Sequence, residues 1–194
     1  MQNNEAKIVG IVLSGGKSKR MGQEKGLVKY KGKALIEYAI DTLKLLCHEL
    51  VISTANDDYA YLDLQMIADK IPDCGPIGGI STCMKSVEAD IYLVISCDTP
   101  HIPTALFVDL LNQLKGNAII PIDESGRQQP LVAAYASSAS NYFHQALQSR
   151  NLKMMNLISS LETQFFILSS DLDYYSANTF TNFNRMEDIS DIKV

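Results

Sequence analysis

The chain has 194 residues, of which 46% are hydrophobic and 20% charged, and its formal net charge is −5. This composition excludes a mainly disordered chain, and the length suits one domain with a substantial hydrophobic core. The acidic balance argues against a duplex-binding surface, because neutralising backbone phosphates takes a broad excess of Lys and Arg. We therefore expect one folded domain over residues 1–194 and no nucleic-acid partner.

The apolar segments are too short to cross a membrane. The longest apolar runs, at residues 8–13 and 91–95, fall far short of the roughly 20 residues that a bilayer requires. The amino terminus has no basic region followed by an apolar one, the pattern typical of a secretory signal. We therefore expect a cytoplasmic protein. Its four cysteines form no C-x-x-C pair of the kind that binds zinc, so we expect them to be buried free thiols.

Patterns typical of strands and helices alternate along the chain. Residues 7–13 form a β-branched apolar run, typical of a strand buried on both faces, and the run ends at Ser14-Gly15-Gly16. Apolar residues at helical spacing follow over residues 35–46. The remaining predicted elements are strands at 50–53, 66–68, 91–96, 118–120 and 131–135 and helices at 77–87 and 104–114.

This alternation predicts the α/β class, with a mostly parallel sheet covered by helices on both faces. In such a sheet, ligands bind at the carboxyl ends of the strands. The later part departs from the pattern, because turn-forming residues at 123–127 join two strand candidates and predict a hairpin, hence a mixed portion of the sheet. Residues 169–184, rich in Asp, Ser, Thr and Asn, are expected to form an ordered loop across the top of the sheet.

The loop after the first strand, residues 14–25, combines glycines with four cations in an otherwise acidic chain. Glycines let backbone N–H groups approach an anion closely, so we interpret the loop as a polyphosphate cradle. It matches neither the Walker A pattern nor the G-x-G-x-x-G spacing of dinucleotide folds. A solvated basic turn is the alternative interpretation.

A second signal is Asp98, which follows the apolar run at residues 91–96 and therefore lies beside the expected ligand cleft. A single carboxylate together with phosphate oxygens commonly holds Mg²⁺. The alternative is an ordinary turn or helix N-cap aspartate. Asp69 also follows an apolar run, although the strand pattern before it is weaker than that before Asp98.

The glycine turn at residues 75–79 allows two interpretations. It would let a flat base lie against the backbone, or it would simply begin a helix.

These signals occur together in one order, and the chain thereby resembles the molybdenum cofactor guanylyltransferases of the MobA type. The matching segments, which span nearly the whole chain, are 13–16, 20–22, Lys25, Asp69, 75–79, 97–100, 129–131 and Phe180-x-Asn182-x-Asn184. The ordered set is much more specific than any one motif, because many sugar-nucleotide and cytidylyl transferases share the first loop. The resemblance implies a three-layer α/β/α, Rossmann-like nucleotidyltransferase fold of the glycosyltransferase-A-like kind.

The resemblance also implies a reaction. GTP and molybdenum-loaded molybdopterin would give molybdopterin guanine dinucleotide and pyrophosphate, with Mg²⁺ required. The nucleophile would be the terminal phosphate of molybdopterin, which is anionic near neutral pH, so alignment and charge neutralisation are needed rather than a general base. The expected partners are these two small molecules, and transient contacts with proteins of molybdopterin synthesis or molybdoenzyme maturation would be compatible with the reaction.

By the resemblance, three residues would be catalytic: Arg20 and Lys25 would neutralise the triphosphate, and Asp98 would hold Mg²⁺. The positions with an implied role in binding nucleotide, metal or acceptor are Leu13, Ser14, Gly15, Gly16, Lys25, Thr54, Asn56, Asp69, Gly78, Asp98, Asn182 and Asn184. The glycine-rich positions would line the nucleotide and its phosphates through backbone groups. Asn182 and Asn184 would bind near the reaction centre.

The choice of base is also implied by the resemblance. Related cytidylyltransferases usually read Leu-Ala-Ala-Gly in the first loop and guanylyltransferases read Leu-Ala-Gly-Gly, so Gly15 favours a purine nucleotide. A position without a side chain leaves room for the larger base. Asp69, with Thr54 or Asn56, would help to place the nucleoside.

Two positions depart from the family pattern, since Ser14 and Gly78 each replace a usual alanine. Both residues are small, so we expect the same reaction. The two departures leave the strength of nucleotide binding unpredicted. The alternatives are a cytidylyl or sugar-nucleotide transferase on the same fold, and a non-catalytic module that binds or delivers the cofactor. Joint presence of Arg20, Lys25 and Asp98 argues against the second alternative, because a carrier has no need of a metal carboxylate.

Overall fold

The computed structural model describes residues 6–14, 24–183 and 188. Within them the main sheet consists of β1 Ile8–Leu13, β4 Glu49–Ser53, β5 Gln65–Ile67, β6 Ile91–Ser96, β7 Ala118–Ile122, β8 Val132–Ala136 and β9 Thr163–Ile167. The strand order is β5-β4-β1-β6-β8-β7-β9. Strands β4, β5, β1 and β6 pair in parallel, β8 is antiparallel to both of its neighbours, and β9 is parallel to β7. The predicted mostly parallel sheet with a mixed later portion is confirmed.

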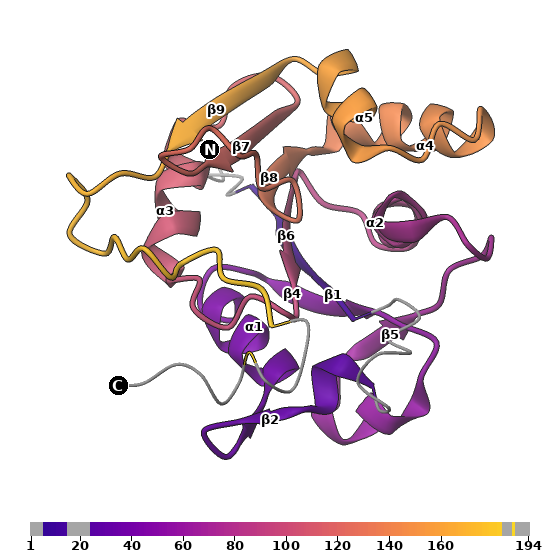
Figure 1. Ribbon diagram of the computed structural model, residues 1–194. Helices are drawn as coiled ribbons and strands as arrows, with labels where there is room; N and C mark the ends of the chain where they lie inside the picture. The colour runs from indigo at the N-terminus through magenta and orange to yellow at the C-terminus, as the bar shows by residue number, and fades with distance from the viewer. Residues whose placement is uncertain (1–5, 15–23, 184–187, 189–194) are drawn as a thin grey trace, which may run out of the picture.

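Helices cover both faces of the sheet. The described α-helices are α1 Leu35–Leu43, α2 Gly75–Ser86, α3 Thr104–Gln113, α4 Ser140–Gln148 and α5 Met154–Ser160. Figure 1 shows α1 and α3 on one side of the sheet and α2, α4 and α5 on the other. None of the described helices has the length and hydropathy of a membrane span. The three-layer α/β/α architecture is therefore confirmed.

The two layers of core follow from the alternation of side chains along the strands. In β1, Val9, Ile11 and Leu13 belong to the cluster under α2, α4 and α5, whereas Val12 belongs to the cluster under α1 and α3. Because β1 and β6 lie in the middle of the sheet, nearly all of their side chains are buried. This explains why both strands read as continuous apolar runs rather than as alternating ones.

The predicted elements agree with the structure, and the elements that the prediction missed lie mainly in the last third of the chain. The turn at residues 123–127 joins β7 and β8 as a hairpin, as predicted. Strand β9 and helices α4 and α5 were not predicted. Helix α4 buries few side chains, chiefly Phe143 and Ala146, so its apolar pattern is sparse. A short hairpin of β2 Lys29–Tyr30 and β3 Lys33–Ala34 was also missed, because two-residue strands carry almost no periodicity.

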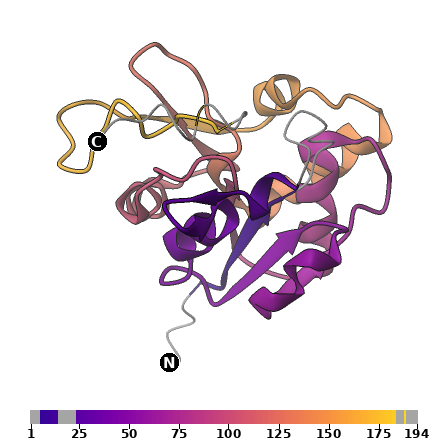
Figure 2. The ribbon, with the colours of Figure 1, turned by 60° about the horizontal axis from the view of Figure 1, so that its bottom comes forward.

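Residues 169–183 contain neither helix nor strand, in agreement with the expected ordered loop. Figure 2 shows this segment, in yellow, running beside the turn between β7 and β8. The segment ends at Phe183, which is fully buried against Tyr30 and His101. Its backbone N–H donates to the Asp98 carbonyl oxygen at 2.9 Å, so the loop returns to the carboxyl end of β6.

The four cysteines are free thiols, as predicted. Cys74, Cys83 and Cys97 are buried and Cys47 is partly buried. Burial raises the pKa of the Cys83 and Cys97 thiols to about 12, so both stay protonated near neutral pH. They pack as small apolar side chains.

We predict that Phe107→Ala lowers the free energy of unfolding by about 3–5 kcal/mol, the range for deleting a large buried aromatic side chain. Phe107 is fully buried on the inner face of α3, whereas its neighbour Val108 is 39% exposed. Urea unfolding followed by circular dichroism measures the change. Val108→Ala, the matched control in the same helix, should lower stability by less than about 1 kcal/mol. Equal losses in the two variants would contradict the packing described.

Candidate functional site

Polar residues follow each of the four parallel strands at one edge of the sheet. Ser14 follows β1, Thr54 follows β4, Asp69 lies just beyond β5 and Asp98 lies just beyond β6. Carboxyl ends of neighbouring parallel strands meet at the same edge, so the fold brings these sequence-distant residues together. Four of the residues predicted from the sequence thus share one edge.

The ion pair between Lys25 and Asp98 lies at the centre of this edge. Lys25 begins the short helix η1 Lys25–Leu27, and its Nζ donates to Asp98 Oδ2 at 2.6 Å although the two residues are 73 positions apart. Ser96 Oγ donates to the other carboxylate oxygen at 2.6 Å. The side chains of Lys25 and Asp98 are 16% and 17% exposed. Both predicted catalytic groups are therefore held together and remain reachable from solvent.

A cavity of about 570 Å³ lies at the same edge of the sheet, and its lining includes Glu24, the residue before Lys25. We refer to it as the Asp69 cavity, and it is lined by Ser14, Glu24, Ser53, Thr54, Ala55, Asn56, Asp69 and Pro72. Its volume falls within the range of about 300–1,000 Å³ that is usual for small-molecule sites. Four of its lining residues were predicted to bind the nucleotide: Ser14, Thr54, Asn56 and Asp69.

The Asp69 carboxylate packs against the first turns of α2. A Cβ atom at Gly78 would lie 3.3 Å from Asp69 Oδ2 and 2.7 Å from the Cys74 Cβ, and one at Gly79 would lie 2.4 Å from Ser53 Oγ. Glycine is therefore required for this close approach. Burial raises the pKa of the Asp69 carboxyl group. The glycine turn begins helix α2 at Gly75, which is one of the two interpretations that it allowed, and Gly78 in the first turn lies against Asp69.

Thr54 and Asn56 form a turn that lines the same cavity. Thr54 Oγ1 accepts the backbone N–H of Asn56 at 3.1 Å. Asn56 Oδ1 accepts the backbone N–H of Asp58 at 3.0 Å and so caps the short helix η2 Asp57–Leu62. The amide oxygen is used by the fold, so the Asn56 NH₂ group is the part of this side chain best placed to donate to a ligand.

A buried tyrosine that sequence reasoning missed connects two ends of the first loop. The hydroxyl of Tyr59 accepts from Ser14 Oγ at 2.5 Å and donates to Glu24 Oε1 at 3.1 Å. Burial raises the Tyr59 pKa, so the phenol keeps its proton. Gly26 leaves room for this network, because a Cβ atom there would lie 2.4 Å from the Tyr59 oxygen. Ser14, one of the departures from the family pattern, thus has a structural partner.

No local pattern marks Tyr59 as part of a site. It follows two aspartates in a short helix, and its role arises only because η2 packs under the carboxyl end of β1. Ser96 is likewise an ordinary last residue of a strand in the sequence. Its contact with Asp98 comes from the turn that follows β6.

Several predicted residues are placed elsewhere or not described. Gly15, Gly16, Arg20 and Asn184 lie outside the described residues. Leu13 ends β1 with its side chain buried in the core, and its carbonyl oxygen accepts a hydrogen bond of 3.1 Å from the backbone after β6.

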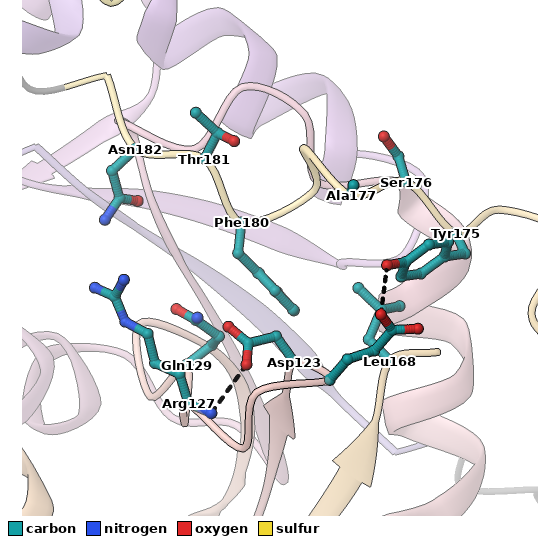
Figure 3. Close-up of a pocket in the computed structure, with 11 residues that line it drawn as sticks. Asp123, Arg127, Gln129, Leu168, Tyr175, Ser176, Ala177, Phe180, Thr181 and Asn182 are labelled. Carbon is teal, nitrogen blue, oxygen red and sulfur yellow. Dashed lines mark hydrogen bonds between the residues drawn. The ribbon is translucent and has the colours of Figure 1, made fainter. Parts of the chain in front are cut away.

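Asn182 lines a second cavity, of about 390 Å³, which we refer to as the Asp123 cavity (Figure 3). The residues around it are Asp123, Glu124, Arg127, Gln129, Leu168, Tyr175, Ser176, Ala177, Phe180, Thr181 and Asn182. They come from the β7–β8 turn, the end of β9 and the loop over residues 169–183. Asn182 immediately precedes Phe183, whose backbone bonds to Asp98.

The donor set at Asp98 is compatible with Mg²⁺. In the part of the chain that the structure describes, no three His, Cys, Asp or Glu side chains gather into a metal cage. Mg²⁺ does not need one, because it commonly binds one or two carboxylates and completes its shell with substrate phosphates and water. Asp98, whose side chain is 17% exposed at the carboxyl edge of the parallel strands, is suited to supply such a carboxylate.

The sequence is similar to those of known nucleotidyltransferases over nearly its whole length. Residues 10–163 match the family model described as "MobA-like NTP transferase domain". A protein of Flavobacterium johnsoniae named "Probable molybdenum cofactor guanylyltransferase" is 31% identical over 185 residues, which cover 95% of each chain. A protein of the same name from Bacillus cereus strain AH820 is 31% identical over 191 residues, which cover 94% of each chain.

Solved structures show the same fold. Molybdopterin-guanine dinucleotide biosynthesis protein A from Archaeoglobus fulgidus superposes with a TM-score of 0.75 and 22% identity, over 94% of this chain and 95% of that one. 4-Diphosphocytidyl-2C-methyl-D-erythritol synthase from Anaerococcus prevotii superposes with a TM-score of 0.71 and 14% identity, over 95% and 93%. The chain therefore belongs to the family of MobA-like NTP transferase domains and is a nucleotidyltransferase enzyme.

Proposed function

We propose that the enzyme transfers GMP from GTP to the terminal phosphate of molybdenum-loaded molybdopterin and releases pyrophosphate. The names of the relatives, at 31% identity over 95% of the chain, support this choice of substrates. The observation that carries the proposal is the presence of the Lys25–Asp98 pair and the Asp69 cavity at the same carboxyl edge of the parallel strands. A cation, a carboxylate and an adjoining cavity suit the binding of a metal-associated nucleoside triphosphate.

The proposed reaction is a displacement at the α-phosphorus of GTP. An oxygen of the acceptor phosphate forms the new P–O bond, and the bond from the α-phosphorus to the oxygen bridging to the β-phosphorus breaks. Because the acceptor oxygen is already anionic, no proton has to be removed. The protein must align the reactants and neutralise negative charge. Lys25 would neutralise negative charge by moving its ammonium group from Asp98 to the triphosphate.

Asp98 would hold Mg²⁺ when the nucleotide binds, and the ion would supply positive charge at the phosphate oxygens. Ser96 would keep the carboxylate oriented, because its hydroxyl bonds to Oδ1 at 2.6 Å and leaves Oδ2 to Lys25. The ammonium group now balances the charge of Asp98. Arrival of a divalent cation would release Lys25 toward the phosphates, so both residues contribute to the same charge balance.

We infer that the nucleoside occupies the Asp69 cavity. The carboxylate of Asp69 can accept hydrogen bonds from ring N–H and amino groups, both of which guanine presents on one edge. The cytosine ring lacks a protonated ring nitrogen, so a carboxylate discriminates against it. The Asn56 amide group, on the same wall, would donate to the nucleoside.

The first prediction concerns the nucleotide. Wild-type enzyme with Mg²⁺ and molybdopterin should release pyrophosphate from GTP, whereas an equal concentration of CTP should give a kcat/KM at least about tenfold lower, as expected for loss of a buried hydrogen-bonded pair. Pyrophosphate is measured by a coupled assay in parallel reactions. A preference for CTP would contradict the proposed function and favour the cytidylyltransferase alternative.

The second prediction concerns Asp98. Asp98→Ala should lower kcat by a factor on the order of 10²–10³, because charge at the reacting phosphates is no longer neutralised by a held metal. The circular dichroism spectrum should keep its wild-type shape, and the melting temperature should fall by a few degrees because Lys25 loses this mostly shielded ion pair. Asp171→Ala, which removes an exposed aspartate from the late loop, is the control and should keep full activity. Unchanged turnover in Asp98→Ala would remove this residue from the mechanism.

The third prediction concerns pH. Burial raises the pKa of Asp69, so on acidification its carboxylate takes up a proton at a higher pH than the ordinary value of 3.8 would give. The protonated form accepts fewer hydrogen bonds, and the GTP dissociation constant should therefore rise as pH falls through this raised pKa. Asp69→Asn should bind GTP more weakly near neutrality and lack this step.

Titration calorimetry of both proteins across the acidic range measures the effect. Protonation of GTP itself affects both titrations equally, so the difference between the two profiles reports Asp69. Parallel profiles would show that Asp69 does not contact the base.

A further inference from the structure

A buried hydrogen-bond network links residues from three segments of the site, and we refer to it as the Tyr59 network. Tyr59, in η2, is fully buried, and Ser14, which follows β1, is 2% exposed. The Tyr59 hydroxyl donates to Glu24 Oε1 at 3.1 Å and accepts from Ser14 Oγ at 2.5 Å. A carboxylate oxygen only accepts, so Tyr59 gives its single proton to Glu24 and Ser14 donates to Tyr59. The direction of every bond in the network is thereby set.

One end of the Tyr59 network holds the backbone that carries Lys25. Glu24, which is bonded to Tyr59, precedes Lys25 in the chain. Gly26 follows Lys25, and a Cβ atom there would lie 2.4 Å from the Tyr59 oxygen and 2.6 Å from Ser14 Oγ. The backbone on both sides of Lys25 is therefore in contact with the network, by a hydrogen bond on one side and by close packing on the other.

The other end of the Tyr59 network meets the segment that carries Asp98. Cys97 precedes Asp98, and its backbone N–H donates to the carbonyl oxygen of Leu13, the residue before Ser14, at 3.1 Å. Burial raises the pKa of the Cys97 thiol, and a hydrogen bond with the Ser14 side chain opposes this rise. The network therefore provides a second connection between the two segments that the Lys25–Asp98 pair joins.

The two connections differ in what nucleotide binding would do to them. Under the proposed function, Lys25 leaves Asp98 for the triphosphate, so the ion pair no longer joins its two segments. Tyr59 and Ser14 are uncharged and buried, so a metal-bound triphosphate would not compete for the hydrogen bond between them. A misplacement of about 1 Å can cost about 100-fold in rate. A connection that persists while the ion pair opens would keep Lys25 at the position from which it reaches the phosphates.

We propose that Tyr59 is a positioning residue for nucleotidyl transfer, which through Glu24 holds the backbone of Lys25 in place relative to that of Asp98 while the lysine binds the triphosphate. Tyr59 is fully buried, so it acts through its neighbours rather than on the substrate. The inference rests on the proposed function, in which Lys25 neutralises the triphosphate. Ser14, at a position where the family usually has alanine, supplies the hydroxyl that completes the connection.

The test uses Tyr59→Phe, which keeps the packed ring and removes only the hydroxyl. The probe is inorganic tripolyphosphate with Mg²⁺, titrated by calorimetry, because it carries the charges that Lys25 would bind but has neither a base nor a pterin. Tyr59→Phe should raise the tripolyphosphate dissociation constant about 3- to 10-fold, the effect expected for the loss of one hydrogen bond. An unchanged dissociation constant would overturn the proposal.

The matched control is Tyr92→Phe. Tyr92 is 3% exposed near the amino end of β6, and its hydroxyl donates to the Val87 carbonyl oxygen at 2.8 Å. Each variant loses a buried hydrogen bond, so each should lower the melting temperature by a few degrees. Tyr92→Phe should nevertheless bind tripolyphosphate as the wild type does. An equal rise of the dissociation constant in the two variants would assign the effect to general stability and overturn the proposal.

A double variant shows whether Tyr59 acts through Lys25. Lys25→Ala should itself weaken the binding of tripolyphosphate. Adding Tyr59→Phe to Lys25→Ala should cause no further loss, because the ammonium group that Tyr59 positions is already absent. Losses that add in the double variant would show that Tyr59 acts apart from Lys25 and would overturn the proposal. A preference of the enzyme for CTP over GTP would refute the proposed function alone, since these titrations contain no nucleotide.

Discussion

The contact on which the site depends is the ion pair between Lys25 and Asp98. It joins the segment after β1 to the segment after β6, two neighbouring strands whose parallel pairing brings their carboxyl ends together. A lysine and an aspartate mostly shielded from water are stable only as partners or with a ligand, because an isolated charge there would lose its hydration. Under the proposed function, a metal-bound triphosphate would replace the partner that each of these two charges now has.

Hydrogen bonds on both sides of the Lys25–Asp98 pair hold the backbone segments that carry the two residues. Tyr59 bonds to Ser14 and Glu24 and so fixes the residues that precede and follow the first loop, and Glu24 is adjacent to Lys25. The Phe183 amide fixes the backbone of Asp98 from the other side. Lys25 and Asp98 thus lie between two hydrogen-bonded segments, one on each side of the pair. Such preorganisation is what a reaction governed by alignment and charge requires.

The antiparallel strand β8 makes the two halves of the sheet differ at this edge. On the β1 side, parallel strands end in short polar segments that line the Asp69 cavity. On the β8 side, the reversed strand places a hairpin turn at the same edge, and that turn carries Arg127 into the Asp123 cavity. A wholly parallel sheet would have no hairpin turn at this position. The difference between the linings of the two cavities thus follows from the direction of one strand.

The sequence by itself determined the fold class and the central part of the site. Runs of apolar residues ending in polar ones predict parallel strands with Ser14, Asp69 and Asp98 at their carboxyl ends, because burial on both faces leaves a strong local pattern. Only the tertiary structure decided the contacts of Tyr59, the approach of Gly78 to Asp69, and the cavity between the late loop and the β7–β8 turn. These contacts join residues far apart in the chain, and the spacing of residues along a sequence carries no record of which distant side chains will meet.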